Sequence, residues 1–158
     1  MRNLTESAKV SKLIRKELKG AFPIIKFSVT SKSYSMGCSV KIRYSNGPTT
    51  AAIEAITNKY LQGHFNSSED LYESTNYRSD IPLTKYVFIE RDIDISINEK
   101  ALTYIKEKVG GIDSNAGLNS YIQDRNLCVR EFINRLTKDI DLSDGLYEKD
   151  IDLALNII

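Results

Sequence analysis

The sequence predicts an α+β fold in which a helix, a β-hairpin, a second helix and a third strand precede C-terminal helices. Three observations predict it: apolar residues recur at helical spacing over 8–18, alternate with polar residues over 26–44, and return to helical spacing from residue 96 onward. We expect the strands to form an antiparallel sheet with helices covering one face. The 158 residues are expected to divide into an α-β-β-α-β domain over 1–95 and an acidic helical extension over 96–158 packed on it.

The first helix is expected to begin after Thr5, whose hydroxyl can cap it, and to end near Gly20. Its apolar stripe consists of Ala8, Leu13, Ile14 and Leu18. Its exposed face is expected to be basic and to carry Lys9, Lys12, Arg15, Lys16 and Lys19.

Alternating polarity over 26–30 and 38–44 predicts two strands, joined by a connection at 33–37. If the strands pair, Lys26, Lys41 and Arg43 share the outward face. Tyr34 lies in the connection and is expected to be exposed, whereas Tyr44 is expected to pack in the core.

The turn signal Asn46-Gly47-Pro48 precedes a second helix, which Thr49 or Thr50 can cap and which is expected to end at Gly63. Residues 64–83 are polar and contain Pro82, so they are interpreted as a long loop. The expected apolar anchors of this loop are Phe65, Leu71, Tyr72 and Tyr77.

The apolar run Tyr86-Val87-Phe88-Ile89 predicts a buried third strand. Ser96 and Glu99 form a capping box for a third helix that ends at Gly110-Gly111. A longer helix is expected from about Ser120 to Lys138. Residues 151–158 fit either a terminal strand or a short helix, and the pattern does not decide between them.

The chain carries no recognisable catalytic or metal-binding constellation, so we expect a binding protein that is not an enzyme and uses no metal or cofactor. The single histidine, His64, follows a predicted helix end, where a solvated or capping role is more typical than a general base. Cys38 and Cys128 have no metal-ligand spacing and are expected to be reduced core residues.

An enzymatic alternative requires a metal ion held by clustered carboxylates. The residues that would have to converge on it are Asp70, Glu90, Asp92 and Asp94. No apolar run approaches the roughly 18 residues of a membrane span, and the N-terminal residues lack the apolar core of a signal peptide. A cytoplasmic location without a membrane partner is therefore expected.

Charge is distributed unevenly along the chain. Residues 1–44 hold ten Lys/Arg and two acidic residues, whereas residues 45–158 hold 12 Lys/Arg and 19 acidic residues. Either a charged partner such as nucleic acid or an acidic protein surface exploits this asymmetry, or the two parts attract each other in the fold. The basic binding surface expected from the first part consists of Lys9, Lys12, Arg15, Lys16, Lys19, Lys26, Lys41 and Arg43, with Tyr34 available to stack on a base.

Residues 7–95 resemble the family of the large polyvalent protein associated domain, type twenty-nine. The segments that carry the resemblance are the first helix with Ala21-Phe22-Pro23, Lys26-Phe27-Ser28-Val29, Gly37, the turn Asn46-Gly47-Pro48-Thr49, Gly63-His64-Phe65-Asn66 with Asp70-Leu71-Tyr72, and Tyr86–Arg91. Tyr44 stands where the family often has Trp, and Asn46 and Asn66 stand where it has Asp. The resemblance implies a small α+β domain of phages and conjugative elements, found in proteins thought to enter a new host with the DNA, and it transfers no catalytic residue.

Two functions follow as expectations. The first is a phage or mobile-element accessory protein that binds and inhibits a host defence protein or nucleoprotein complex, in an anti-CRISPR-like role in the host cytoplasm. The alternative is a module that binds DNA or RNA through the basic first helix and the hairpin. The identity of the target, the oligomeric state and the choice between the basic and the acidic surface stay open.

Overall fold

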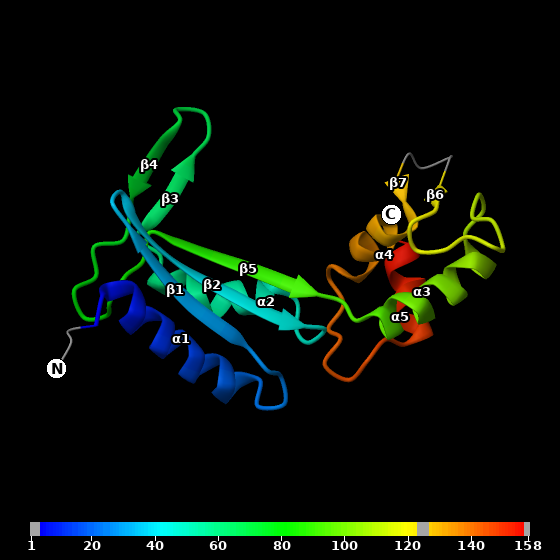
Figure 1. Cartoon of the computed structure of the whole chain (residues 1–158), viewed down its shortest axis with the longest axis horizontal. Coiled ribbons are helices and arrows are strands. Elements are labelled where there is room, and N and C mark those ends of the chain that lie inside the picture. The colour runs from blue at the N-terminus through cyan, green and yellow to red at the C-terminus, as the bar shows by residue number, and fades with distance from the viewer. Residues whose placement is uncertain (1–3, 123–126, 157–158) are drawn as a thin grey trace. The chain divides into compact units, whose positions relative to one another are not determined.

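The computed structural model describes residues 4–122 and 127–156. The chain forms two compact units (Figure 1). The first unit comprises Met1–Tyr44 and Thr50–Arg91, and the second comprises Ser45–Thr49 and Asp92–Ile158. Both helices and strands are present, which confirms the predicted α+β class.

Helix α1 (Glu6–Ala21) opens the first unit and is capped as expected. The Thr5 hydroxyl accepts a hydrogen bond from the backbone N–H of Ala8 at 3.3 Å, which satisfies one of the free donors at the helix N-terminus. The buried apolar residues of α1 are Val10, Ile14 and Leu18. Leu13, which the sequence places in the apolar stripe, lies half-buried beside them.

A three-stranded sheet lies against α1, in the order β1-β2-β5. Its strands are β1 (Ser28–Tyr34), β2 (Gly37–Ser45) and β5 (Tyr86–Asp92). β1 and β2 pair antiparallel with Val29 opposite Ile42, so the predicted hairpin is confirmed. The arrows of Figure 1 show β5 running in the same direction as β2. The backbone N–H of Asn46, just after β2, donates a hydrogen bond of 2.7 Å to the carbonyl of Asp92 at the end of β5. The sheet is therefore mixed, where we expected an antiparallel one, because the segment between β2 and β5 returns the chain to its starting end.

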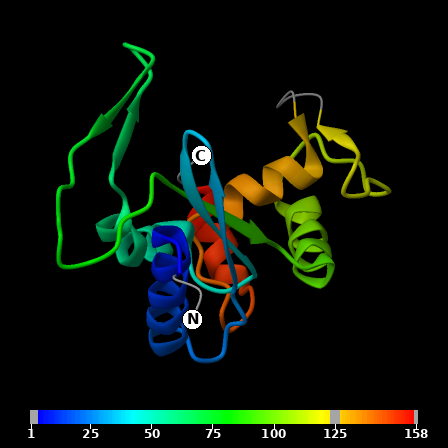
Figure 2. The same cartoon turned by 60° about the vertical axis from the view of Figure 1, so that its left-hand side comes forward.

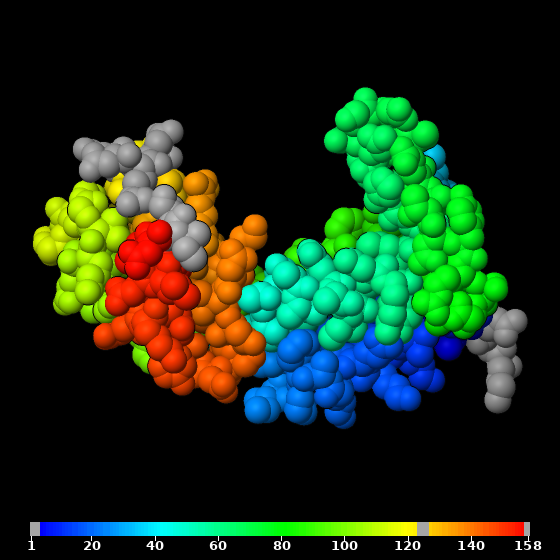
Figure 3. Space-filling view, turned by 180° about the vertical axis from the view of Figure 1, so that it is seen from behind, coloured from blue at the N-terminus to red at the C-terminus, as the bar shows by residue number. Residues whose placement is uncertain are grey.

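One face of this sheet packs against helices. Helix α2 (Thr50–Thr57) and the short 3-10 helix η1 (Asn58–Tyr60) follow β2. Figure 2 shows α1 beside the β1–β2 hairpin, and Figure 3 shows the outer surfaces of α1 and α2 next to each other. The buried core between the helices and the sheet consists of Val10, Ile14, Leu18, Val29, Val40, Ile42, Tyr44, Ile53 and Tyr60.

The polar segment after η1 contains a second hairpin, formed by β3 (Gly63–Asn66) and β4 (Leu71–Ser74). The expectation of a loop throughout 64–83 is therefore wrong for this part. Gly63 begins β3 and does not simply end a helix. A Cβ atom at Gly63 would lie 1.8 Å from the carbonyl oxygen of Glu73, so the close approach of the two strands requires glycine.

The second unit is mainly helical. Its elements are α3 (Ile95–Lys108), β6 (Tyr121–Ile122), β7 (Leu127–Cys128), α4 (Val129–Thr137) and α5 (Glu148–Leu155). Its buried core consists of Ala101, Leu102, Ile105, Val109, Ile122, Leu127, Val129, Phe132, Ile133, Leu136 and Ile151. None of the helices in the described part of the chain combines the length and the apolar composition that a membrane span needs.

Two expectations for this unit are corrected. Helix α3 begins one residue before Ser96, with Asp94 at the capping position, so the expected capping box does not form. The helix expected from Ser120 begins only at Val129, because residues 121–122 and 127–128, which precede it, pair as β6 and β7. The segment after residue 150, which fitted a strand or a helix, continues α5 to Leu155, and positions 157–158 lie outside the described residues.

Candidate functional site

The first unit presents two separate charged surfaces. Strand residues alternate between the core and the opposite face of the sheet, which we call the open face. The open face carries Lys32 on β1, Lys41 and Arg43 on β2, and Tyr86, Phe88 and Glu90 on β5. The basic surface of α1 belongs to the helical side, away from the open face.

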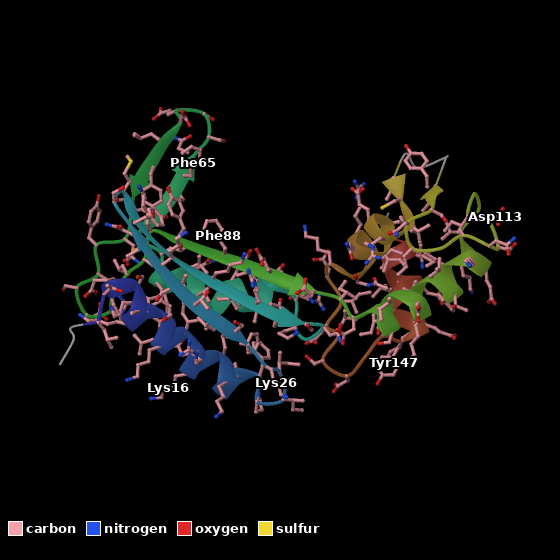
Figure 4. All side chains as sticks on the ribbon, viewed as in Figure 1. Lys16, Lys26, Phe65, Phe88, Asp113 and Tyr147 are labelled. Carbon is pink, nitrogen blue, oxygen red and sulfur yellow. The ribbon has the colours of Figure 1, made fainter. Side chains whose placement is uncertain are left out.

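Three lysines of α1 form one line on its exposed side. Lys12, Lys16 and Lys19 are spaced by four and three residues, which places them on one helix face. Lys26, in the connection after α1, is also exposed, and Figure 4 shows it on the same side of the unit as Lys16. Within residues 4–122 and 127–156, none of these four lysines has an ion pair. We call Lys12, Lys16, Lys19 and Lys26 the lysine stripe.

The other two basic residues expected on this helix are engaged within the fold. Lys9 Nζ lies 2.6 Å from a carboxylate oxygen of Glu6. The guanidinium of Arg15 donates a hydrogen bond to the carbonyl of Val29 and so ties α1 to β1. Of the basic residues that the sequence predicted for this side of the unit, the four lysines of the lysine stripe are therefore the ones available to a partner.

On the open face, Lys41 and Arg43 share one carboxylate. Arg43 Nε donates to Glu90 Oε2 at 2.9 Å, and Lys41 pairs with the other oxygen. The hydrogen bond from Lys41, followed by that from Arg43, lowers the pKa of Glu90. Because the sheet separates Lys41 and Arg43 from α1, the structure does not bring the predicted basic residues together as one surface.

An aromatic row also lies on the open face, and sequence reasoning missed it. The rings of Tyr86 and Phe88 are stacked with centroids 6.0 Å apart. Tyr72 of β4 meets Tyr86 edge-on at 5.4 Å. Lys85 Nζ lies 4.8 Å from the centroid of the Tyr72 ring and 5.6 Å from that of Tyr86. We call Tyr72, Tyr86 and Phe88 the aromatic row.

Both tyrosines that the sequence singled out are placed as expected. Tyr34 is exposed at the end of β1. Its ring lies 3.4 Å from the position that a Cβ atom of Gly37 would occupy, next to the side chain of Lys85. Tyr44 is buried and contacts Phe27, with ring centroids 5.2 Å apart.

The structure does not bring the candidate metal-binding carboxylates together. Within the described ranges, no three His, Cys, Asp or Glu side chains gather as a metal ion would require. Glu90 pairs with the cations of β2, and the Asp94 carboxylate accepts a hydrogen bond from Asn46 Nδ2 at 2.8 Å. His64 is exposed, with Nε2 3.7 Å from a carboxylate oxygen of Glu73 on the opposite strand.

The second unit has a groove between α3 and α5 with a volume of about 550 Å³. It is lined by Ser96, Glu99, Lys100, Thr103, Tyr104, Glu107, Leu146, Glu148 and Ile151. The Tyr104 hydroxyl donates to Asp152 Oδ2 at 2.8 Å, and this hydrogen bond, followed by burial, raises the pKa of Tyr104 to about 12. The lining is acidic on balance, in keeping with the 13 acidic and eight basic residues of the second unit.

Comparison with known proteins adds one finding. The model of the family "large polyvalent protein associated domain 29" matches residues 5–103. This range covers the whole α-β-β-α-β part, including the lysine stripe and the open face. No curated protein and no solved structure matches the chain significantly.

Proposed function

Because the chain belongs to the large polyvalent protein associated domain 29 family and is thereby associated with phages and mobile elements, we propose that it acts by binding, without catalysis. The proposed partner is a defence complex of the host cell that contains nucleic acid, such as a CRISPR effector, and the proposed consequence is inhibition of that complex in the host cytoplasm. The lysine stripe is the observation that carries this proposal.

Four features support a polyanionic contact at the stripe. Its members are exposed, lie on one side of the unit, carry the same charge and lack an ion pair among the described residues. Unpaired lysines close together repel one another, so an anionic partner that neutralises them gains free energy. Phosphates of a guide or target strand are the anions that a defence nucleoprotein presents in quantity.

The acidic second unit offers a complementary contact for the protein part of such a complex. Its groove carries Glu99, Glu107 and Glu148, and carboxylates of this kind complement the basic channels in which defence proteins hold nucleic acid. The two units thus present opposite charges, with a net of +6 in the first and −5 in the second.

A titration tests the proposed function. Purified chain is added to CRISPR effectors with and without their guide and target, and complex formation is followed by native gel and by the rate of target cleavage. Lys12→Glu with Lys16→Glu is compared with Arg130→Glu with Lys149→Glu, a matched double reversal at two exposed cations of the second unit outside its groove. We expect a complex with slowed cleavage, weakened by the first pair only; absence of a complex with every effector tested would overturn the proposal.

Direct binding of DNA or RNA is the second candidate function, and the same stripe favours it. Lysines at this spacing can follow successive phosphates of a strand without reading sequence. A gel-shift panel at low salt tests this candidate, and no shift with any single- or double-stranded DNA or RNA would count against it.

A further inference from the structure

We propose that the open face binds single-stranded nucleic acid by stacking unpaired bases on the aromatic row while neighbouring cations hold the phosphates. This inference rests on the second candidate function, that the chain binds nucleic acid, but it assigns the binding to a surface separate from the lysine stripe. The proposed ligand chemistry, an unpaired base with its phosphate, is shared by DNA and RNA.

The aromatic row provides the stacking surface. Phe88 lies in a β-strand, where apolar side chains normally face the core, yet it is 52% exposed. Its strand neighbours Val87 and Ile89 pack against the helical side, so Phe88 and Tyr86 project to the open face. Aromatic side chains two positions apart on a strand lie on the same face of the sheet, and successive unpaired bases can stack on their rings.

The charges beside the row fit phosphates. Lys85 Nζ lies over the rings of both Tyr72 and Tyr86, so a cation adjoins the stacking surface. Lys41 and Arg43 lie on the neighbouring strand, and their two positive charges face one carboxylate, that of Glu90. Lys32, on β1, is exposed on the same face. Cations thus outnumber carboxylates among these residues, as an anionic ligand requires.

The combination of rings and cations favours an unpaired nucleotide over a duplex or an apolar protein segment. In a duplex the base faces are stacked inside the helix, so aromatic side chains on a sheet can reach only unpaired bases. An apolar protein segment would cover the rings, but it would bury the charge of Lys85 without an anion and leave Lys41 and Arg43 to share the single carboxylate of Glu90. An unpaired nucleotide satisfies both requirements at once.

Fluorescence anisotropy of labelled oligonucleotides tests the inference on the full chain. The probes are oligothymidylate and oligouridylate of about 20 nucleotides and a duplex of the same length. Phe88→Leu keeps apolar bulk on the strand but removes the aromatic face, whereas Phe88→Trp keeps it. Tyr147→Ala is the matched control, because Tyr147 is an aromatic residue of equal exposure, 52%, in the second unit; Figure 4 labels both residues.

We expect Phe88→Leu to weaken single-strand binding about 5- to 100-fold, the loss of one stacked base. Phe88→Trp and Tyr147→Ala should bind like the unaltered chain, and the duplex should bind more weakly than either single strand. Equal affinity of Phe88→Leu and the unaltered chain, or equal affinity for duplex and single strand, would overturn the inference.

The outcome separates this inference from the proposed function. A chain that forms a defence complex but binds no oligonucleotide at low salt refutes the stacking site and leaves the proposed function standing. A chain that binds single strands through Phe88 but forms no defence complex supports the stacking site and refutes the proposed function. Preference between the thymidylate and uridylate probes identifies DNA or RNA as the natural strand.

Discussion

The hydroxyl of Tyr60 donates a hydrogen bond to the carboxylate of Glu17 across 2.8 Å, which joins η1 to helix α1. Lys59 Nζ lies 2.7 Å from the other oxygen of the same carboxylate. Burial and the bond to Glu17 raise the pKa of Tyr60. One carboxylate thus fixes helix α1, which carries three members of the lysine stripe, against the segment that leads to the β3–β4 hairpin.

Folding stability should depend on pH through Glu17. Burial alone raises the pKa of Glu17, but the hydrogen bonds from Lys59 and Tyr60 and the charge of Lys59 outweigh it, so the pKa lies below its ordinary value of 4.5. A carboxyl with a lowered folded-state pKa stabilises the fold above its unfolded-state pKa, and this contribution is lost as the pH falls through the lowered value.

We therefore expect the free energy of unfolding to decline as the pH falls below about 4.5, and Glu17→Gln to make that decline shallower. Because this carboxylate is partly solvated, the contribution is less than about 1 kcal/mol. Urea unfolding between pH 3 and 7, at roughly one-unit steps, measures it. Identical pH profiles for Glu17→Gln and the unaltered chain would contradict the prediction.

Gly63→Ala should destabilise the β3–β4 hairpin. The added Cβ atom would collide with the backbone of Glu73, which cannot move without breaking the strand pairing. We expect a loss of about 1–3 kcal/mol, together with faster amide exchange over 63–74. Gly20→Ala is the control, because nothing lies within 4 Å of its added Cβ; in helix α1 it should stabilise the fold by up to about 1 kcal/mol. Equal melting temperatures for the two variants would refute the argument.

Charge reversal of the lysine stripe should change the salt dependence of nucleic-acid binding more than its base preference. Each lysine that neutralises a phosphate releases a counterion, so the logarithm of affinity falls with the logarithm of salt concentration. Lys12→Glu with Lys16→Glu should reduce that slope by about 1–2. Anisotropy titrations in increasing salt measure the slope, and Arg130→Glu with Lys149→Glu should leave it unchanged.

Glu90→Gln should tighten single-strand binding on the open face. The substitution leaves Lys41 and Arg43 without the carboxylate that they share in the free chain, so both cations become available to phosphates. We expect an increase in affinity of about 2- to 5-fold at low salt that disappears at high salt. Unchanged or weaker binding at low salt would show that these cations do not contact the strand.

Local patterns were sufficient for the elements whose pairing partners lie nearby in the sequence. The cap at Thr5 and the hairpin of β1 and β2 follow from a hydroxyl before a helical stripe and from strict alternation. Local patterns were insufficient where the strands are very short. β6 and β7 have two residues each, and β3 and β4 have four residues each within a largely polar segment. None of these strands has enough alternation to distinguish it from loop or helix.

The candidate site also has one part that local spacing predicts and one part that it does not. The basic face of α1 was predictable, because helical spacing fixes which lysines share a side. The aromatic row was not, because the run Tyr86–Ile89 is equally apolar at every position and predicts a strand buried on both faces. That α1 and α2 both pack on one side of the sheet is a property of long-range contacts.

By itself the sequence determined the α+β class, the family and the clustering of positive charge in the first 44 residues, since these depend on residue type and local spacing. Only the tertiary structure decided that Arg15 and Lys9 are engaged internally, that Lys41 and Arg43 lie on the opposite side of the sheet from the lysine stripe, and that Phe88 is exposed. The physical reason is that exposure depends on which elements pack on which face, and residues far apart in the chain make that choice.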